Sequence, residues 1–167
     1  MSPLRWAGDR LVLMAQTRLP VEEVERSCAT WPEVADCIRT LVVRGAPAIG
    51  VAAAFGVALA ARRSGARDFQ GLLADLEEAI KGLGATRPTA VNLFWGLGRM
   101  REAFEAALVA LRGDVAGVCA RLVAAAEAIV AEDVETCRAI GRSGLEVIPE
   151  NARLLTHCNA GALATAG

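Results

Sequence analysis

The stretch from Gly45 to Ala61 contains no charged residue, although charged residues make up 22% of the chain. Arg44 precedes it, and the pair Arg62 and Arg63 follows it. A helix that is apolar on every side is either buried or embedded in a membrane. This stretch is shorter than the roughly 20 apolar residues that a membrane span needs. It is also rich in alanine and glycine, which let helices approach closely. The sequence therefore predicts a buried helix that opens at Pro47 and ends near Arg63.

The chain before this helix predicts a small β element and a first helix. Alternating and β-branched runs indicate short strands over Leu4–Trp6, Arg10–Gln16 and Glu22–Ala29. Thr30 and Glu33 are spaced for a capping box, and a proline at position 32 suits the first turn of a helix. The sequence therefore places a helix directly after the third strand.

Three further helices are predicted after the buried one. Each begins at a capping or turn residue and carries apolar residues at helical spacing. They start at Asp68, Thr89 and Gly113-Asp114 and end near Gly84, Leu111 and Ile148. A break in the last one is expected near Gly141 or Gly144. The predicted class is α+β for residues 1–150: a small antiparallel β element and a bundle of about five helices.

The charge and cysteine content exclude several classes of function. The formal net charge of −1 gives no basic footprint for nucleic acid. Five cysteines form no C-x-x-C pair, and with a single histidine they give little support for a metal site. Their odd number and the absence of a signal peptide favour the reducing cytoplasm. All except Cys158 are expected to be small buried hydrophobic residues.

The last fifteen residues predict the start of a second unit. Leu154–Thr156 is typical of a short buried strand, and the alanine-rich run after Asn159 is typical of a helix start. Backbone N–H groups at such a turn favour a reactive thiolate. His157 and Cys158 would lie there. Two interpretations stay open: a reactive thiol, or a buried cysteine beside a histidine that bonds the backbone.

Two arginines precede proline-containing helix starts. Arg44 is followed by Gly45 and Pro47, and Arg87 is followed by Pro88. Free N–H groups at a helix start, together with a guanidinium, suit a phosphate. The alternative for Arg44 is that it caps the end of a neighbouring helix.

The remaining polar and aromatic candidates have plainer interpretations. Phe94 and Trp95 are expected in the core or at a domain interface rather than stacked on a ligand. Glu132, Asp133 and Glu135 are expected on a solvated helix face.

Three segments resemble, in the same order, the signatures of the methylthioribose-1-phosphate isomerases. They are Arg44–Gly50, Arg87–Trp95 and Thr156–Gly161. The opening is similar to the start of that family too, at Trp6, Leu11–Leu13, Gln16-Thr17 and Leu19-Pro20. The resemblance covers essentially the whole chain, and three long motifs in one order are highly specific.

The resemblance implies an aldose–ketose isomerase of methionine salvage. Such an enzyme converts 5-methylthioribose 1-phosphate to 5-methylthioribulose 1-phosphate. By motif, Cys158 is implied as the catalytic cysteine, and the substrate ligands are implied to be Arg44, Gly45, Ala46 and Arg87. No cofactor or metal, no nucleic acid and no membrane is implied. The family is typically dimeric, so a homodimer is expected of the full-length protein.

The resemblance also implies a second domain. Residues 151–167 would begin a Rossmann-like domain that is truncated here, and the family's catalytic aspartate lies in that domain. The 167-residue chain alone is therefore expected to be inactive. Two alternatives remain: a ribose-1,5-bisphosphate isomerase, and a non-catalytic regulatory relative of the initiation factor 2B subunits. Cys158 favours an isomerase over the regulatory relative.

Overall fold

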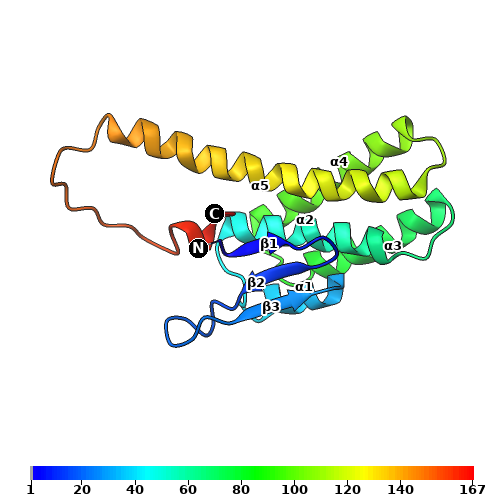
Figure 1. Ribbon diagram of the computed structural model, residues 1–167, viewed down its shortest axis with the longest axis horizontal. Coiled ribbons are helices and arrows are strands. Elements are labelled where there is room, and N and C mark those ends of the chain that lie inside the picture. The colour runs from blue at the N-terminus through cyan, green and yellow to red at the C-terminus, as the bar shows by residue number, and fades with distance from the viewer. Residues whose placement is uncertain (1) are drawn as a thin grey trace.

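A computed structural model describes residues 2–167 and contains the small sheet and the five helices that the sequence predicts (Figure 1). Three antiparallel strands come first, and the long helices α2, α4 and α5 run lengthwise through the molecule. The elements are β1 (Leu4–Trp6), β2 (Leu11–Met14), β3 (Glu25–Cys28), α1 (Trp31–Arg39), α2 (Ala46–Arg63), α3 (Phe69–Gly84), α4 (Val91–Ala110), α5 (Val115–Leu145) and the short 3₁₀ helix η1 (Ala162–Ala164).

The sheet has the order β1-β2-β3, and β2 is its central strand. Leu4 pairs with Leu13, and Leu11 pairs with Cys28. These four side chains are buried. The second and third strands are shorter than predicted because the chain leaves the ladder after Met14. The N–H of Gln16 binds the carbonyl of Val42 instead of a neighbouring strand.

Helix α2 is the centre of the molecule, as its lack of charge predicts. Every residue from 48 to 61 is buried, and α2 contacts all four other α-helices. Trp6 stacks on Phe55, with the ring centroids 5.2 Å apart, and so joins the sheet to α2. Within the described residues α2 is the one helix whose length and composition would allow a membrane span, and 78% of it is buried inside the protein. This burial confirms the prediction of a core helix.

Helices α2 and α4 touch through their backbones at two glycines. A Cβ added to Gly50 would lie 2.6 Å from the carbonyl oxygen of Asn92. A Cβ added to Gly96 would lie 2.4 Å from the carbonyl oxygen of Gly50. No side chain larger than hydrogen fits between the helices here. The contact brings the first turns of α2 and α4 side by side.

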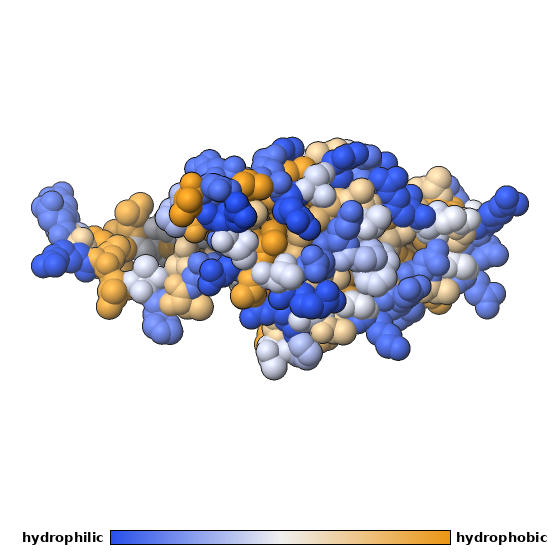
Figure 2. All heavy atoms as spheres, turned by 90° about the horizontal axis from the view of Figure 1, so that it is seen from below, coloured by the Kyte–Doolittle hydropathy of each residue, from blue (hydrophilic) through white to orange (hydrophobic). Residues whose placement is uncertain are grey.

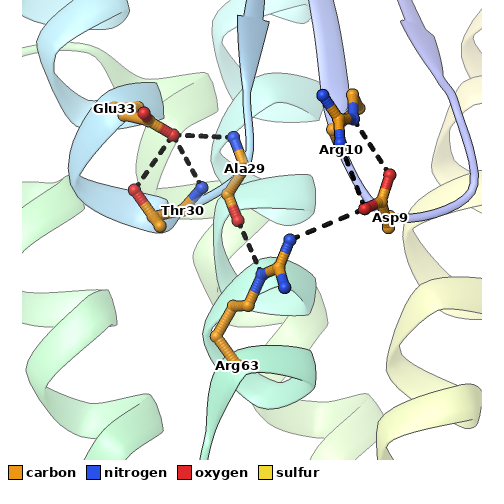
Figure 3. Close-up of polar contacts among 6 residues, drawn as sticks. All are labelled: Asp9, Arg10, Ala29, Thr30, Glu33 and Arg63. Carbon is orange, nitrogen blue, oxygen red and sulfur yellow. Dashed lines mark hydrogen bonds and ion pairs between the residues drawn. The ribbon is translucent and has the colours of Figure 1, made fainter.

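The capping box at the start of α1 forms as predicted (Figure 3). The Glu33 carboxylate accepts hydrogen bonds from the N–H groups of Ala29 and Thr30, at 2.7 and 2.9 Å, and from the Thr30 hydroxyl. Arg63, at the end of α2, donates to the carbonyl of Ala29 and pairs with Asp9 in the β1–β2 turn. The beginning of α1 is therefore tied to the sheet and to the end of α2.

We expect Glu33→Ala to lower the free energy of unfolding by about 1 kcal/mol at neutral pH. Burial raises the pKa of the Glu33 carboxyl, but the hydrogen bonds from Ala29 and Thr30 outweigh it and hold that pKa below its ordinary value. The stabilisation is therefore present above the unfolded pKa and is lost as the pH falls through the folded pKa. Urea unfolding between pH 7 and pH 3 measures this loss. An unchanged difference between wild type and variant at pH 3 would contradict the assignment. Glu23→Ala, at an exposed position, is the control.

The chain after α5 departs from the prediction. Helix α5 continues to Leu145 without a break at Gly141 or Gly144. The predicted buried strand Leu154–Thr156 is not formed: the segment is irregular, and Leu155 is 99% exposed. A strand needs a neighbouring strand for its backbone groups. The described residues place no strand next to this segment, so its apolar run has nothing to pair with. The predicted helix from Ala160 is reduced to the single turn η1.

Candidate functional site

Arg44, Gly45 and Ala46 lie at the start of α2. Arg44 and Ala46 are exposed, and Gly45 is the N-cap residue with φ of 95°. Arg44 has no ion-pair or side-chain hydrogen-bond partner within residues 2–167, so it does not cap another helix there. A Cβ on Gly45 would lie 2.3 Å from the Cα of Ala164. The structure thus accounts for this glycine by its positive φ and by the close approach of η1.

Arg87 lies in the turn that joins α3 to α4. Its side chain is half-buried, and its guanidinium has no protein partner among the described residues. The carbonyl of Arg87 accepts from the N–H of Ala90, which is the N-cap residue of α4. Arg87 is therefore fixed at the helix start by its backbone, and its charge remains available.

The two helices that follow these arginines begin without a side-chain cap. Gly45 and Ala90 offer no capping side chain, and neither first turn contains an acidic residue. In contrast, the carboxylates of Asp68 and Asp114 accept hydrogen bonds at the starts of α3 and α5. Uncapped N–H groups and the positive end of a helix dipole attract anions. The starts of α2 and α4 have the chemistry of a phosphate site.

A cleft of about 330 Å³ lies beside these two helix starts. Helices α2, α4 and α5 all contribute to its walls. The lining residues are Pro47, Val51, Val91, Asn92, Trp95, Glu132, Asp133 and Thr136. The α2 and α4 side is apolar apart from the amide of Asn92, and the α5 side carries two carboxylates and a hydroxyl. Such a cleft suits a small ligand with one apolar and one polar side.

Glu132 and Glu135 are exposed on α5, as the sequence predicted, and Asp133 is half-buried. Glu132 and Asp133 also line the cleft and form its acidic wall. Glu132 receives two hydrogen bonds from Arg99, at 2.8 and 3.0 Å. These bonds hold the pKa of Glu132 below its ordinary value, against the opposing effect of burial. Asp133 accepts a hydrogen bond from the N–H of Ala166. The position of this pair depends on how α5 crosses α4, and no local signal in the sequence reports that crossing.

Phe94 and Trp95 are not in the core. They are 47% and 44% exposed, because the buried stripe of α4 runs through Leu93, Leu97 and Met100 and excludes the positions between them. Trp95 lines the cleft, and the guanidinium of Arg99 lies 5.3 Å from its ring centroid. The sequence predicted either the core or a domain interface for these two residues. The domain interface stays a prediction.

Cys158 and His157 are exposed in the irregular segment between α5 and η1. Cys158 has φ of 67°, in the left-handed region that is uncommon for residues other than glycine. The strand-to-helix turn predicted around it does not form, so the argument from a helix N-terminus does not apply. Cys158 is not among the residues that line the cleft, and neither are Arg44 and Arg87.

The other four cysteines are shielded to different degrees. Cys28 and Cys37 are fully buried as predicted, with their sulfur atoms 3.6 Å apart, and Cys119 and Cys137 are half-buried. The hydrogen bond with Cys37 and burial raise the pKa of the Cys28 thiol. Burial also raises the pKa of Cys119. Cys158 is the exposed thiol of the described chain. No group of three or more potential metal ligands occurs within residues 2–167.

The family is decided by a sequence profile. The profile of the initiation factor 2 subunit family matches residues 42–166, from just before the start of α2 to the end of η1 and beyond. The chain belongs to the initiation factor 2 subunit family.

Within this family the chain is similar to curated isomerases. It is 51% identical to the methylthioribose-1-phosphate isomerase of Thermosynechococcus vestitus, over 99% of this chain and 46% of that protein. It is also 51% identical to the methylthioribose-1-phosphate isomerase of Heliobacterium modesticaldum, over 100% of this chain and 48% of that protein. The chain thus spans about half the length of the curated relatives that it matches.

Two solved structures share the fold. The 5-methylthioribose 1-phosphate isomerase of Pyrococcus horikoshii superposes with a TM-score of 0.87 at 40% identity, over 99% of this chain and 45% of that chain. The delta subunit of translation initiation factor eIF-2B from A. fulgidus superposes with a TM-score of 0.85, also at 40% identity, over 99% of this chain and 47% of that chain. The small sheet and the five helices are therefore common to an isomerase and to an initiation factor subunit.

Proposed function

We propose that this chain forms one side of the active site of an aldose–ketose isomerase that converts 5-methylthioribose 1-phosphate to 5-methylthioribulose 1-phosphate. The observation that carries the proposal is the identity of about half of all residues to curated isomerases, over nearly the whole chain. The uncapped starts of α2 and α4 and the cleft beside them support a small phosphorylated substrate.

The reaction defines what the site must supply. The bond between C1 and the ring oxygen breaks, and the ring oxygen takes up a proton. The hydrogen on C2 moves to C1, and the C2 hydroxyl loses its proton and becomes the ketone. An acid must therefore be placed at the ring oxygen and a base at the C2 hydroxyl. We assign the thiol of Cys158 to one of these proton transfers. We assign Arg44, Arg87 and the N–H groups of Gly45 and Ala46 to the phosphate and sugar oxygens.

The second acid–base group is proposed to lie in a Rossmann-like domain that follows residue 151. The family profile continues through residue 166, and the curated relatives are about twice as long as this chain. Exposed apolar side chains gather where α5 ends and the chain turns back, including Leu145, Val147, Leu154 and Leu155 (Figure 2). Such a surface suits contact with a further domain or a second subunit. The expected homodimer and the cytoplasmic location remain proposals.

The complete gene product is the protein encoded by the whole reading frame that contains this chain. The test is an assay of the complete gene product with 5-methylthioribose 1-phosphate as substrate. NMR of the mixture should show a C2 ketone and a C1 methylene that still carries phosphate. The 167-residue chain, assayed beside it, should give no product. Turnover by the short chain would contradict the division of the site between two domains.

A regulatory protein is the second candidate. It is favoured by one observation, the superposition on the eIF-2B delta subunit, which is nearly as close as that on the isomerase. That candidate predicts a complete gene product that binds a phosphorylated sugar and leaves it unchanged. Calorimetry with the same substrate separates the two functions.

We expect Arg87→Ala to weaken substrate binding by the complete gene product at least about tenfold, because a charge-assisted hydrogen bond to phosphate contributes roughly 1.5–3 kcal/mol. The melting temperature should hardly change, since the guanidinium has no protein partner in the described chain. Arg87→Lys should restore binding only in part, because an ammonium does not reproduce the bidentate fork.

The control for Arg87 is Arg67→Ala, at an exposed position at the other end of α3. It should change neither affinity nor melting temperature. If the Arg87→Ala variant has a much lower melting temperature and normal substrate affinity, Arg87 stabilises the fold and is not a substrate ligand.

A further inference from the structure

Residues 162–166 are docked on the protein by contacts from three distant parts of the chain. They follow the exposed segment that carries Cys158, yet Ala164 and Ala166 are buried. In Figure 1 this last piece of the chain lies against the start of α2 and beside the N-terminal strand. Ser2 reaches it as well, with its hydroxyl 3.3 Å from the carbonyl oxygen of Ala166. An exposed segment therefore ends in an anchored one.

Gln16 provides the first anchor. It is 8% exposed and is the one polar residue that is buried within the described chain. Its side-chain amide donates a hydrogen bond of 2.7 Å to the carbonyl of Leu163, and its own N–H binds Val42, just before the start of α2. A buried amide is costly unless it is paired. The pairing therefore fixes Leu163 to Gln16, which lies just after β2 and beside the chain that leads into α2.

Asp133 provides the second anchor, from the middle of α5. Its carboxylate accepts a hydrogen bond of 2.7 Å from the N–H of Ala166. A hydrogen bond to a charged acceptor is stronger than one between neutral groups. Gly45 lies between the two anchors, and the backbone of Ala164 fills the space where its side chain would be. The start of α2 is thus the floor on which this segment rests.

We propose that Gln16 and Asp133 are positioning residues for Cys158. They hold residues 162–166 on the start of α2, and so fix the point at which the chain that carries Cys158 returns to Arg44 and Gly45. Ala162 is four steps along the chain from Cys158, a reach of at most about 14 Å. Without the two anchors Ala162 is no longer held on the start of α2, and Cys158 is no longer kept within this distance of it. The proposal rests on the proposed function, in which Cys158 acts on a substrate held at the starts of α2 and α4.

The first test measures the anchors in the 167-residue chain, without any activity. Asp133→Ala and Gln16→Leu should each speed amide hydrogen exchange in the peptide that contains residues 163–167, by about three- to tenfold. Exchange in α5 and the melting temperature should stay unchanged. Asp133→Asn should keep slow exchange, because its amide oxygen still accepts from Ala166. Glu127→Ala, at an exposed position on α5, is the control.

The second test measures the effect on Cys158 in the complete gene product. Asp133→Ala and Gln16→Leu should each lower kcat about tenfold. Gln16 does not line the cleft, so Gln16→Leu should change KM less than twofold, since substrate binding by the helix starts remains. Asp133→Asn should restore kcat. A general structural role would instead lower the melting temperature and speed exchange throughout α5.

Three outcomes overturn the proposal. The first is unchanged exchange at residues 163–167 in both variants, which denies the anchors. The second is an Asp133→Asn variant in which amide hydrogen exchange at residues 163–167 is normal but kcat is low. This result would mean that the carboxylate charge itself takes part in catalysis. The third is a normal kcat in Asp133→Ala despite fast exchange. A wild-type protein that does not turn over the substrate overturns the proposed function and with it the positioning role, while hydrogen exchange still reports whether the anchors exist.

Discussion

Replacing Cys158 by serine should lower the kcat of the complete gene product at least about 100-fold, the usual contribution of a positioned acid or base. KM should change much less, because the lost interaction belongs to the transition state. Serine is nearly the same size as cysteine, and Cys158 is exposed, so the fold should be retained. Steady-state kinetics with 5-methylthioribose 1-phosphate, together with a thermal melt, measure both effects.

The matched control is Cys137→Ser, at a half-buried position on α5. It should leave kcat unchanged. A limiting amount of iodoacetamide should label Cys158 before the other four cysteines, since Cys28 and Cys37 are buried and Cys119 is shielded by α2 and α5. Bound substrate should slow that labelling. Near-normal kcat in Cys158→Ser would contradict the assignment of this thiol to one of the proton transfers.

Local signals in the sequence predict most of the fold. The capping box at Thr30 and Glu33 involves residues three apart, so its chemistry is visible in a short stretch of sequence. The absence of charge through α2 reflects burial on all sides, which a one-dimensional pattern also records. The starts of α3 and α5 follow from Asp68 and Asp114, whose carboxylates cap these helices.

The sequence does not predict features that depend on distant partners. Leu154–Thr156 has the composition of a strand, but a strand forms only beside another strand. The sequence predicts Asp133 as a solvated residue on α5. Its hydrogen bond with Ala166 depends on a residue 33 positions away and is found only in the structure. Gln16 is similar, because the need for an amide there comes from the carbonyl of Leu163. The candidate ligands Arg44 and Arg87 were suggested by local pattern, and their role in binding stays a prediction.

The contact between α2 and α4 makes the second large prediction, on Gly96→Ala. The added Cβ would lie 2.4 Å from the carbonyl oxygen of Gly50, which is backbone and cannot rotate away. The helices must separate, and overpacking of this kind costs about 1–3 kcal/mol or more. The shift also moves Asn92 and Trp95, which line the cleft on the first turns of the same helix. We therefore expect Gly96→Ala to lower both stability and substrate affinity.

Gly98→Ala is the matched control, two residues further along α4. A Cβ there meets nothing within 4 Å. Since alanine is favoured over glycine inside a helix by roughly 0.5–1 kcal/mol, this variant should be slightly more stable than wild type. Urea unfolding of the 167-residue chain measures the two changes, which are opposite in sign although the substitution is the same. Equal stabilisation by both would mean that α2 and α4 are further apart than their backbones indicate, and the proposed cleft between the helix starts would lose its rigid wall.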